Sequence, residues 1–472
     1  MTGAIHELTL AGLASGLRAK RFSSREIVDA LLARIDKADG RLHAFNEVYA
    51  SEARALADGA DKARAAGLPL GPLHGLPIAI KDLCDIAGRV GTGGSVMFAE
   101  RVATETSTTV ERLLAAGMIP LGKTHMVEFA LGGWGTNPLM GAPWNPWDLA
   151  THRVPGGSSS GTGVAVAARL APAGIGSDTG GSVRIPCAFT GLTGVKVTHG
   201  RIGLHGTMLL SHTLDTIGPM ARSVEDCALL LQALAGPDPR DAATLSAPPP
   251  ADYMAAVAPG ARVKGARVAM PDAAQLPEFM KPDAVEAWRA AAATLRGIGV
   301  NVVETRLPDW YFDVAAMSGT VSSTEAYVHH QAYIGDMDKP IGEAVRRRVL
   351  SARNFTPWQY ADAMFAMTGR RRAMAAWFEA YDAILLPTMA TTAIPLAEVD
   401  EASPLPGYLT RPANFLGLCA VSLPAGLSGG LPLGVQIVGK PFAETMVLRL
   451  GKAFQDATDH HRAAPDLAAL GL

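Results

Sequence analysis

Two glycine-rich turns flank a small apolar segment, and the second turn ends in a serine that is placed like a nucleophile. The first turn lies at residues 156–161 and the second runs from Asp178 to Ser182, with a small apolar segment, residues 164–170, between them. Successive glycines let backbone NH groups converge on one point, and such a concavity binds an anion or a developing oxyanion. A flexible linker would not normally enclose a packed apolar segment. The stretch therefore predicts that Ser182 is a nucleophile beside an oxyanion site.

A lysine at the end of an apolar strand is the candidate base for this serine. Residues 75–82 read GLPIAIKD, which predicts a buried strand that ends at Lys81. On this stretch alone, a lysine that reaches the surface or pairs with Asp82 is the favoured interpretation. Ser182 nevertheless needs a base, and no histidine stands in an evident triad arrangement with it. A lysine desolvated enough to be neutral can take the proton as serine attacks a carbonyl, directly or through a second hydroxyl.

Composition excludes several other classes of function. The 472 residues are 48% hydrophobic and 18% charged, which predicts a large core, and the net charge of −2 gives no reason to expect nucleic acid or an anionic membrane as a partner. The four cysteines are widely spaced without a CxxC pattern, which predicts reduced thiols, no structural zinc and a cytoplasmic protein. We expect neither a signal peptide nor a transmembrane helix. Residues 122–125 read GKTH but lack the spacing of a phosphate loop.

Strands alternate with helices along the whole chain. The sequence predicts strands near 75–82, 118–121, 194–197, 263–270, 300–304, 383–387, 414–424 and 433–439. A helical N-terminal segment is expected over about 5–66, with a capping box at Ser23 and Glu26, and a more variable, largely helical region over about 240–380. These patterns predict an α/β fold in which helices cover both faces of a large mixed, mostly parallel sheet. No internal repeat is evident, so we expect a single domain, 1–472.

Taken together, these blocks resemble the amidase signature family of serine hydrolases. The matching segments are residues 75–82, 155–159, 176–186 and 412–414, and the resemblance extends over about 5–455. It implies the amidase signature fold and a triad of Lys81, Ser158 and Ser182, with a cis peptide between Gly157 and Ser158. Ser158 would relay the proton between Lys81 and Ser182. Ser160 departs from the family, which usually has glycine there, and we expect it only to adjust the loop.

The resemblance also assigns the residues around the triad. The backbone NH groups of the turn, those of Thr179, Gly180, Gly181 and Ser182, would form the oxyanion hole. Ser159, Asp178 and Arg184 would hold the triad residues in position without reacting themselves. By analogy of fold, the substrate pocket would include Leu131, Gly132, Gly133 and Trp134 and parts of 318–333. The large side chains Trp134, Met208, Trp310 and Tyr327 are interpreted either as pocket lining or as ordinary core.

The implied function is amide hydrolysis by a free-standing enzyme that acts on a small or aryl amide through a Ser182 acyl-enzyme, without metal or organic cofactor. Carbamate or urethane hydrolysis is a close variant. A third interpretation is the glutamine-hydrolysing A subunit of a tRNA amidotransferase. That subunit holds the glutamine amino group with an acid shortly before the 412–414 block, whereas residues 406–411 here contain none. A non-catalytic binding protein is the alternative of another class. The oligomeric state stays open, with a homodimer among the alternatives because many members of that family are homodimers.

Overall fold

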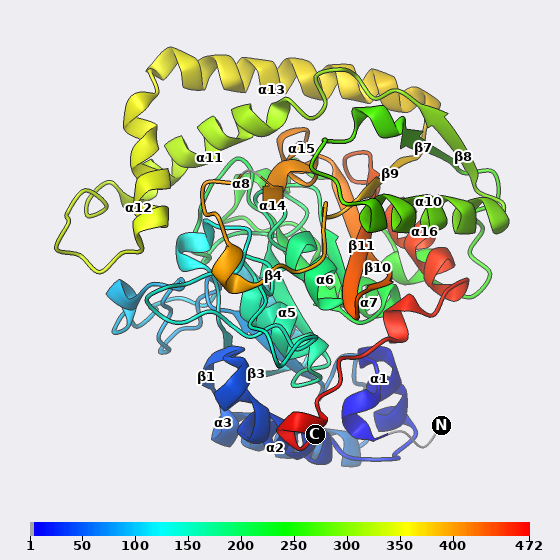
Figure 1. Ribbon diagram of the computed structural model, residues 1–472. Coiled ribbons are helices and arrows are strands. Elements are labelled where there is room, and N and C mark those ends of the chain that lie inside the picture. Colours follow the sequence, from blue (N-terminus) through cyan, green and yellow to red (C-terminus); the bar gives the residue numbers. More distant parts are fainter. Residues whose placement is uncertain (1–3, 404) are drawn as a thin grey trace.

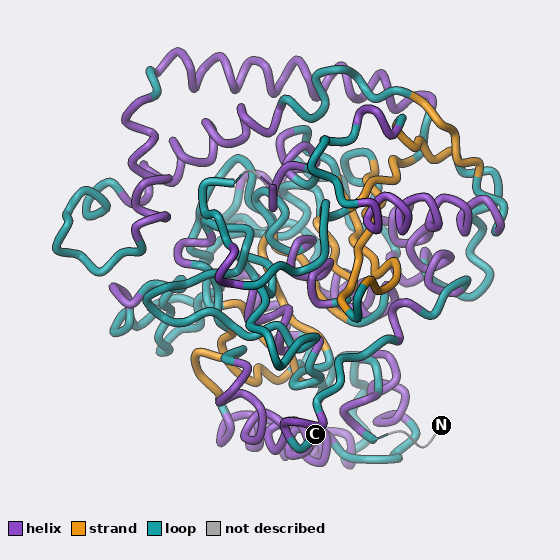
Figure 2. Tube along the Cα trace, viewed as in Figure 1, coloured by secondary structure: helices purple, strands orange, loops and turns teal. Residues whose placement is uncertain are grey.

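The computed structural model describes residues 4–403 and 405–472. Within these residues one sheet of eleven strands runs through the molecule (Figures 1 and 2). In order across the sheet the strands are β1 (Phe45–Val48), β3 (Ile119–Thr124), β2 (Pro77–Lys81), β4 (Ala173–Ser177), β6 (Ile217–Ala221), β5 (Thr193–Lys196), β10 (Cys419–Ser428), β11 (Leu431–Gly439), β9 (Ala383–Pro387), β7 (Arg267–Pro271) and β8 (Asn301–Thr305).

The sheet has two halves that follow the chain. The strands β1 to β6 make one half and the strands β7 to β11 the other, and the halves meet where β5 pairs with β10. The pairing is antiparallel and sets Val195 opposite Val421. The two halves of the chain therefore share one hydrogen-bonded sheet.

The strand directions correct one part of the predicted fold. The sheet is mixed, as expected, but it is not mostly parallel. Parallel pairing joins β2 to β3 and β4, and β7 to β9 and β8, while the six other pairings are antiparallel. Sequence alternation identifies strands but carries no information about the direction of their neighbours, and the long connections typical of parallel pairs here also join antiparallel strands.

Helices flank the sheet as predicted. Every residue of β2, β3, β4, β6 and β11 is buried, although successive side chains point to opposite faces, so both faces of these strands are covered. The helices are α1 (Leu10–Arg18), α2 (Ser24–Leu42), α3 (Ala50–Ala65), α4 (Thr108–Ala115), α5 (Ser160–Ala167), α6 (Arg184–Thr190), α7 (Val224–Leu234), α8 (Ala242–Leu245), α9 (Tyr253–Ala256), α10 (Pro282–Gly297), α11 (Val314–His330), α12 (Glu343–Leu350), α13 (Pro357–Trp377), α14 (Leu405–Tyr408), α15 (Arg411–Phe415) and α16 (Glu444–Asp456).

Most of the predicted elements are present, and the capping box of α2 is confirmed. Ser23 Oγ accepts from the Glu26 NH at 3.1 Å, and the Ser23 NH donates to Glu26 Oε2 at 2.7 Å. The N-terminal segment, however, contains a strand, β1, in addition to its helices. Residues 414–424 were expected to be one strand, yet α15 continues to Phe415 and β10 begins at Cys419. Figure 1 shows α11 and α13 lying across the end of the molecule opposite α1 and α2.

Two strands that the sequence did not predict are β4 and β6. Strand β4 reads AGIGS, which has neither alternation nor β-branched residues beyond Ile175. Its glycines admit helix α5: a methyl carbon built on Gly174 would lie 2.6 Å from Thr162 Cγ2, and one on Gly176 would lie 2.7 Å from Ser159 Oγ. Strand β4 therefore depends on glycine for the close approach of α5, and it ends at Ser177, directly before the glycine turn.

Candidate active site

Lys81 lies at the carboxyl end of β2, wholly buried, with two serine hydroxyls as partners. Its Nζ donates to Ser158 Oγ and to Ser177 Oγ, each at 2.8 Å. Strands β2 and β4 are parallel neighbours, so their carboxyl ends bring Lys81 and Ser177 to the same edge of the sheet. Burial lowers the pKa of Lys81 from its usual value to about 7. Near neutral pH a large fraction of this amine is therefore unprotonated and can accept a proton.

The alternative partner for Lys81, Asp82, is engaged elsewhere. Asp82 forms an ion pair with Lys123, whose Nζ lies 3.2 Å from Asp82 Oδ1, and both side chains are 1% exposed. Asn46 Nδ2 also donates to Asp82 Oδ2 at 3.0 Å. The structure thus excludes the interpretation in which Lys81 pairs with Asp82, and it assigns the lysine of the GKTH stretch to a structural ion pair.

Ser158 follows a cis peptide bond after Gly157, which confirms that prediction. Its neighbour Ser159 donates a backbone NH to the Ser182 carbonyl at 3.3 Å, so the first glycine turn lies directly beside the second. Ser159 Oγ accepts from the Ser177 NH at 3.2 Å and thereby fixes the residue that supports Lys81. Lys81 is thus hydrogen-bonded to Ser158, and Ser182 is next to that serine through the contact of its carbonyl with Ser159. In the described chain the Ser158 and Ser182 hydroxyls do not form a hydrogen bond with each other.

The turn from Asp178 to Ser182 leaves three backbone NH groups open. Across the residues that the structure describes, no protein acceptor takes the NH of Thr179, Gly180 or Ser182. All three residues line a cavity of about 320 Å³. The Gly181 NH instead donates to Asp178 Oδ1 at 2.8 Å, so this predicted oxyanion donor already has a partner inside the protein.

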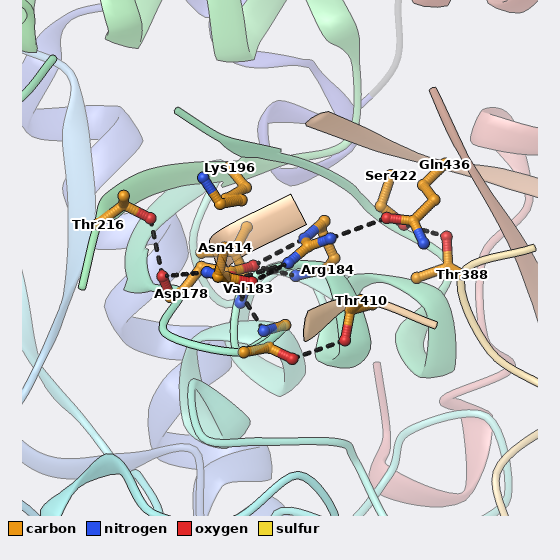
Figure 3. A network of polar contacts seen from close by, with 12 residues as sticks. Asp178, Val183, Arg184, Lys196, Thr216, Thr388, Thr410, Asn414, Ser422 and Gln436 are labelled. Carbon is orange, nitrogen blue, oxygen red and sulfur yellow. Dashed lines mark hydrogen bonds and ion pairs between the residues drawn. The ribbon is translucent and has the colours of Figure 1, made fainter. Parts of the chain in front are cut away.

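A network of hydrogen bonds holds the turn from the interior side (Figure 3). Arg184 and Asp178, both 0% exposed, form a two-point ion pair in which Arg184 Nε and Nη2 each lie 3.0 Å from an Asp178 oxygen. Arg184 also donates to Asn414 Oδ1 at 2.7 Å and to Gln436 Oε1 at 2.8 Å. Burial alone would raise the pKa of Asp178, but the charge of Arg184 holds it well below its usual range. These contacts join Asp178 and Arg184 to the second half of the chain through Asn414 and Gln436.

The cavity above Ser182 contains the predicted pocket residues. Leu131, Gly132, Gly133 and Trp134 line it, as do Ser318 and Ser322 of α11. Trp134 is fixed by its indole NH, which donates to the Asp400 carbonyl at 3.1 Å. The other three large side chains that the sequence left open, Met208, Trp310 and Tyr327, are not among the lining residues and pack against the hydrophobic core.

Sequence reasoning missed several polar residues of the site. Ser177 was not recognised because nothing distinguishes a serine at the end of an unpredicted strand. Arg348, Glu401 and Arg411 also line the cavity, although they lie more than 160 residues after Ser182. Arg411 is the last residue of 406–411, the stretch that contains no acid, and its own charge is the feature of the sequence that could have identified it.

Neither a cluster of metal-binding side chains nor a membrane-spanning helix is found among the described residues. No group of three or more His, Cys, Asp and Glu side chains among them is arranged to hold a metal ion. None of their helices is both long enough and apolar enough to cross a bilayer. The four cysteines are free and buried.

Comparison with known proteins identifies the family. The model of the Amidase family matches residues 26–448. The chain belongs to this family. Among curated members, the A subunit of the glutamyl-tRNA(Gln) amidotransferase of Roseiflexus sp. (strain RS-1) is 37% identical over 98% of this chain and 99% of its own length.

Solved structures give the same amidase fold. The peptide amidase of Stenotrophomonas maltophilia superimposes with a TM-score of 0.85 and 29% identity, covering 98% of each chain. A protein described in connection with the evolutionary origins of an s-triazine catabolic enzyme has a TM-score of 0.88 and 32% identity, covering 95% of this chain and 98% of its own. The amidase relatives thus include both one component of a larger enzyme and an amidase named for its own substrate.

Proposed function

We propose that this protein hydrolyses an amide C–N bond through an acyl-enzyme on Ser182, with Lys81 as the base. One observation carries the proposal: a buried lysine with a pKa of about 7 donates to Ser158, in the turn that lies against Ser182. A lysine in that state can act as general base near neutral pH, and the nucleophile needs such a neighbour because a free serine hydroxyl is weak.

The proposed reaction moves one proton along three residues and back. Ser182 Oγ attacks the amide carbonyl as its proton passes to Ser158, whose own proton passes to Lys81. The open NH groups of Thr179, Gly180 and Ser182 hold the negative charge on the carbonyl oxygen. The proton then returns through Ser158 to the leaving nitrogen as the C–N bond breaks, and the amine departs. Water releases the acid by the same steps in reverse, which regenerates Ser182.

A free-standing amidase for small amides is the form of this function that the cavity favours. Its volume of about 320 Å³ suits a small substrate, and the glycine-rich loop at Leu131 to Trp134 forms one wall. Carbamates present the same carbonyl beside nitrogen and remain a variant of the proposal.

The second candidate is the glutamine-hydrolysing component of a tRNA amidotransferase, and the 37% identity with such proteins favours it. Against it, no acid stands in residues 406–411, where an amino group would be held. Glu401 is the only carboxylate among the described lining residues of the cavity, and Arg348 Nη2 already donates to its Oε2 at 2.8 Å. The chemistry at Ser182 is the same in both candidates, so they differ in substrate and in the need for partners.

The deciding experiment is hydrolysis by the purified chain alone of a chromogenic anilide, a primary aryl amide, a nitrophenyl carbamate and glutamine, with Ser182→Ala as control. We expect turnover of at least one of the first three substrates and its loss in the variant. Activity that appears only with added partner subunits would establish the amidotransferase alternative. Turnover that survives in Ser182→Ala would refute the proposed mechanism.

A further inference from the structure

One of the arginines that line the cavity, Arg411, lies directly against the glycine turn. Arg411 is the first residue of α15, and its side chain lies against the glycine turn. A methyl carbon built on Gly180 would lie 3.2 Å from Arg411 Cγ, and one built on Gly407 would lie 2.7 Å from Arg411 Nε. Two glycines thus make room for this guanidinium beside the NH groups that face the reacting carbonyl.

The charge of Arg411 has no counterpart among the residues that the structure describes. Among residues 4–403 and 405–472, Arg411 forms neither an ion pair nor a side-chain hydrogen bond, although five NH groups are available on it. Arg184 and Arg348, which approach the same turn and cavity, each have a carboxylate partner. Arg411 is only partly buried and lines the cavity, so an anion that binds there gains a charged hydrogen-bond donor that no described residue occupies.

The cavity as a whole carries excess positive charge. Its charged lining residues in the described chain are three arginines and one glutamate, namely Arg347, Arg348, Arg411 and Glu401. Glu401 is held by Arg348 and by Thr136, whose hydroxyl donates to Glu401 Oε1. Burial, together with the charge of Arg348, lowers the pKa of Arg411 from its usual value, and a guanidinium nevertheless keeps its proton in proteins.

We propose that Arg411 binds a carboxylate carried by the substrate, so that the preferred substrates are short amides with an anionic group close to the scissile carbonyl. This inference rests on the proposed function, because it names the substrate class of the same site. Guanidinium and carboxylate match in shape and form two parallel hydrogen bonds. Arg411 flanks Gly180, whose NH faces the carbonyl oxygen in the proposed reaction. Only a short spacer can therefore separate the carboxylate of the substrate from its scissile carbonyl. The cavity volume of about 320 Å³ suits a molecule of this size.

The test compares amides that carry a carboxylate with neutral amides. The monoamides of succinic and glutaric acid carry the carboxylate on the acyl side, their diamides replace it by a neutral amide of the same shape, and N-acetylglycine carries it on the amine side. We expect kcat/KM for a monoamide or for N-acetylglycine to exceed that for the diamides. Arg411→Met should lower kcat/KM for the charged substrate by about 10- to 100-fold, the usual range for a lost hydrogen bond to a charged group, and change the diamides by less than about threefold.

A matched variant and a binding measurement keep the test independent of turnover. Arg372→Met removes the same charge from an exposed position on α13 and should leave both substrate classes unchanged. Calorimetric binding of glutaramate and N-acetylglycine to Ser182→Ala, with and without Arg411→Met, should show the same 10- to 100-fold difference for the charged ligand that is hydrolysed. Equal preference for charged and neutral amides, or ligand binding unaffected by Arg411→Met, would overturn the inference while Ser182-dependent hydrolysis still stands. Activity retained in Ser182→Ala would instead refute the proposed function, and the binding measurement would still decide the role of Arg411.

Discussion

Two arginines, Arg184 and Arg411, approach the same glycine turn from opposite sides and are treated in opposite ways. On the interior side Arg184 is fully buried, and Asp178, Asn414 and Gln436 all accept from it. On the cavity side Arg411 contacts glycines and has no acceptor among the described residues. The charge of Arg184 is neutralised by Asp178, and this ion pair stabilises the turn. The charge of Arg411 has no partner among the described residues and is available to a ligand. Lys81 is fully buried and has no carboxylate partner among the described residues, and its burial favours the neutral amine that the proposed reaction requires.

The largest expected effect on activity comes from removing the proposed base, Lys81. Lys81→Met removes the base and should lower kcat/KM by about 10³- to 10⁴-fold. Because methionine replaces a buried amine with an apolar chain of similar size, the free energy of unfolding should change by no more than about 1 kcal/mol. Steady-state kinetics and urea unfolding of the same preparation measure both quantities. Unchanged turnover would show that Lys81 is not the base.

The same substitution on the interior side should have the reverse result. Arg184→Met leaves Asp178 buried without its partner, so we expect unfolding to become easier by about 3–5 kcal/mol. Urea unfolding, with Arg372→Met as an exposed control that should stay within about 0.5 kcal/mol, measures the loss. If Arg184→Met unfolds at the same urea concentration as the unmodified protein, the ion pair of Arg184 with Asp178 does not stabilise the turn.

The pH dependence tests the state of Lys81. The base must be unprotonated, and its pKa in the folded protein is about 7. We therefore expect kcat/KM to rise about tenfold per pH unit below pH 7 and to level off above it. A profile measured with a substrate that does not itself titrate between pH 5 and 9 gives the midpoint. A midpoint near the usual lysine pKa would contradict a desolvated Lys81.

The smallest effect concerns Ser177, which the sequence did not identify. Lys81 donates to Ser177 Oγ, and a hydrogen bond donated by an ammonium favours its charged form. Ser177→Ala should therefore lower the pKa of Lys81 further and move the pH midpoint downward, with a loss of kcat of about 10-fold or less. A kinetic loss without a shift of the midpoint would mean that Ser177 only fills space.

The sequence and the structure agree best where chemistry restricts residue type. The glycine turn indicated Ser182, and the need for a base made Lys81 a candidate, whereas Ser158 was assigned only by the resemblance to the amidase signature family. Strand β4 was not predictable, since its glycines reflect the approach of α5 and not the strand itself. Arg411 was not predictable as a cavity residue because its position depends on the pairing of β5 with β10, a contact between distant parts of the chain. The prediction of a mostly parallel sheet was wrong for the same reason, because the direction of a neighbouring strand also depends on contacts between distant parts of the chain.

That pairing of the two sheet halves also has a consequence for synthesis of the protein. Lys81, Ser158 and Ser182 leave the ribosome long before Asn414 and Gln436, the residues that complete the hydrogen bonds of Arg184. A nascent chain that ends before residue 410 contains the reacting groups but lacks the contacts that hold the glycine turn from behind. The hydrogen bonds that support the glycine turn through Arg184 can therefore be complete only when nearly the whole chain has been made.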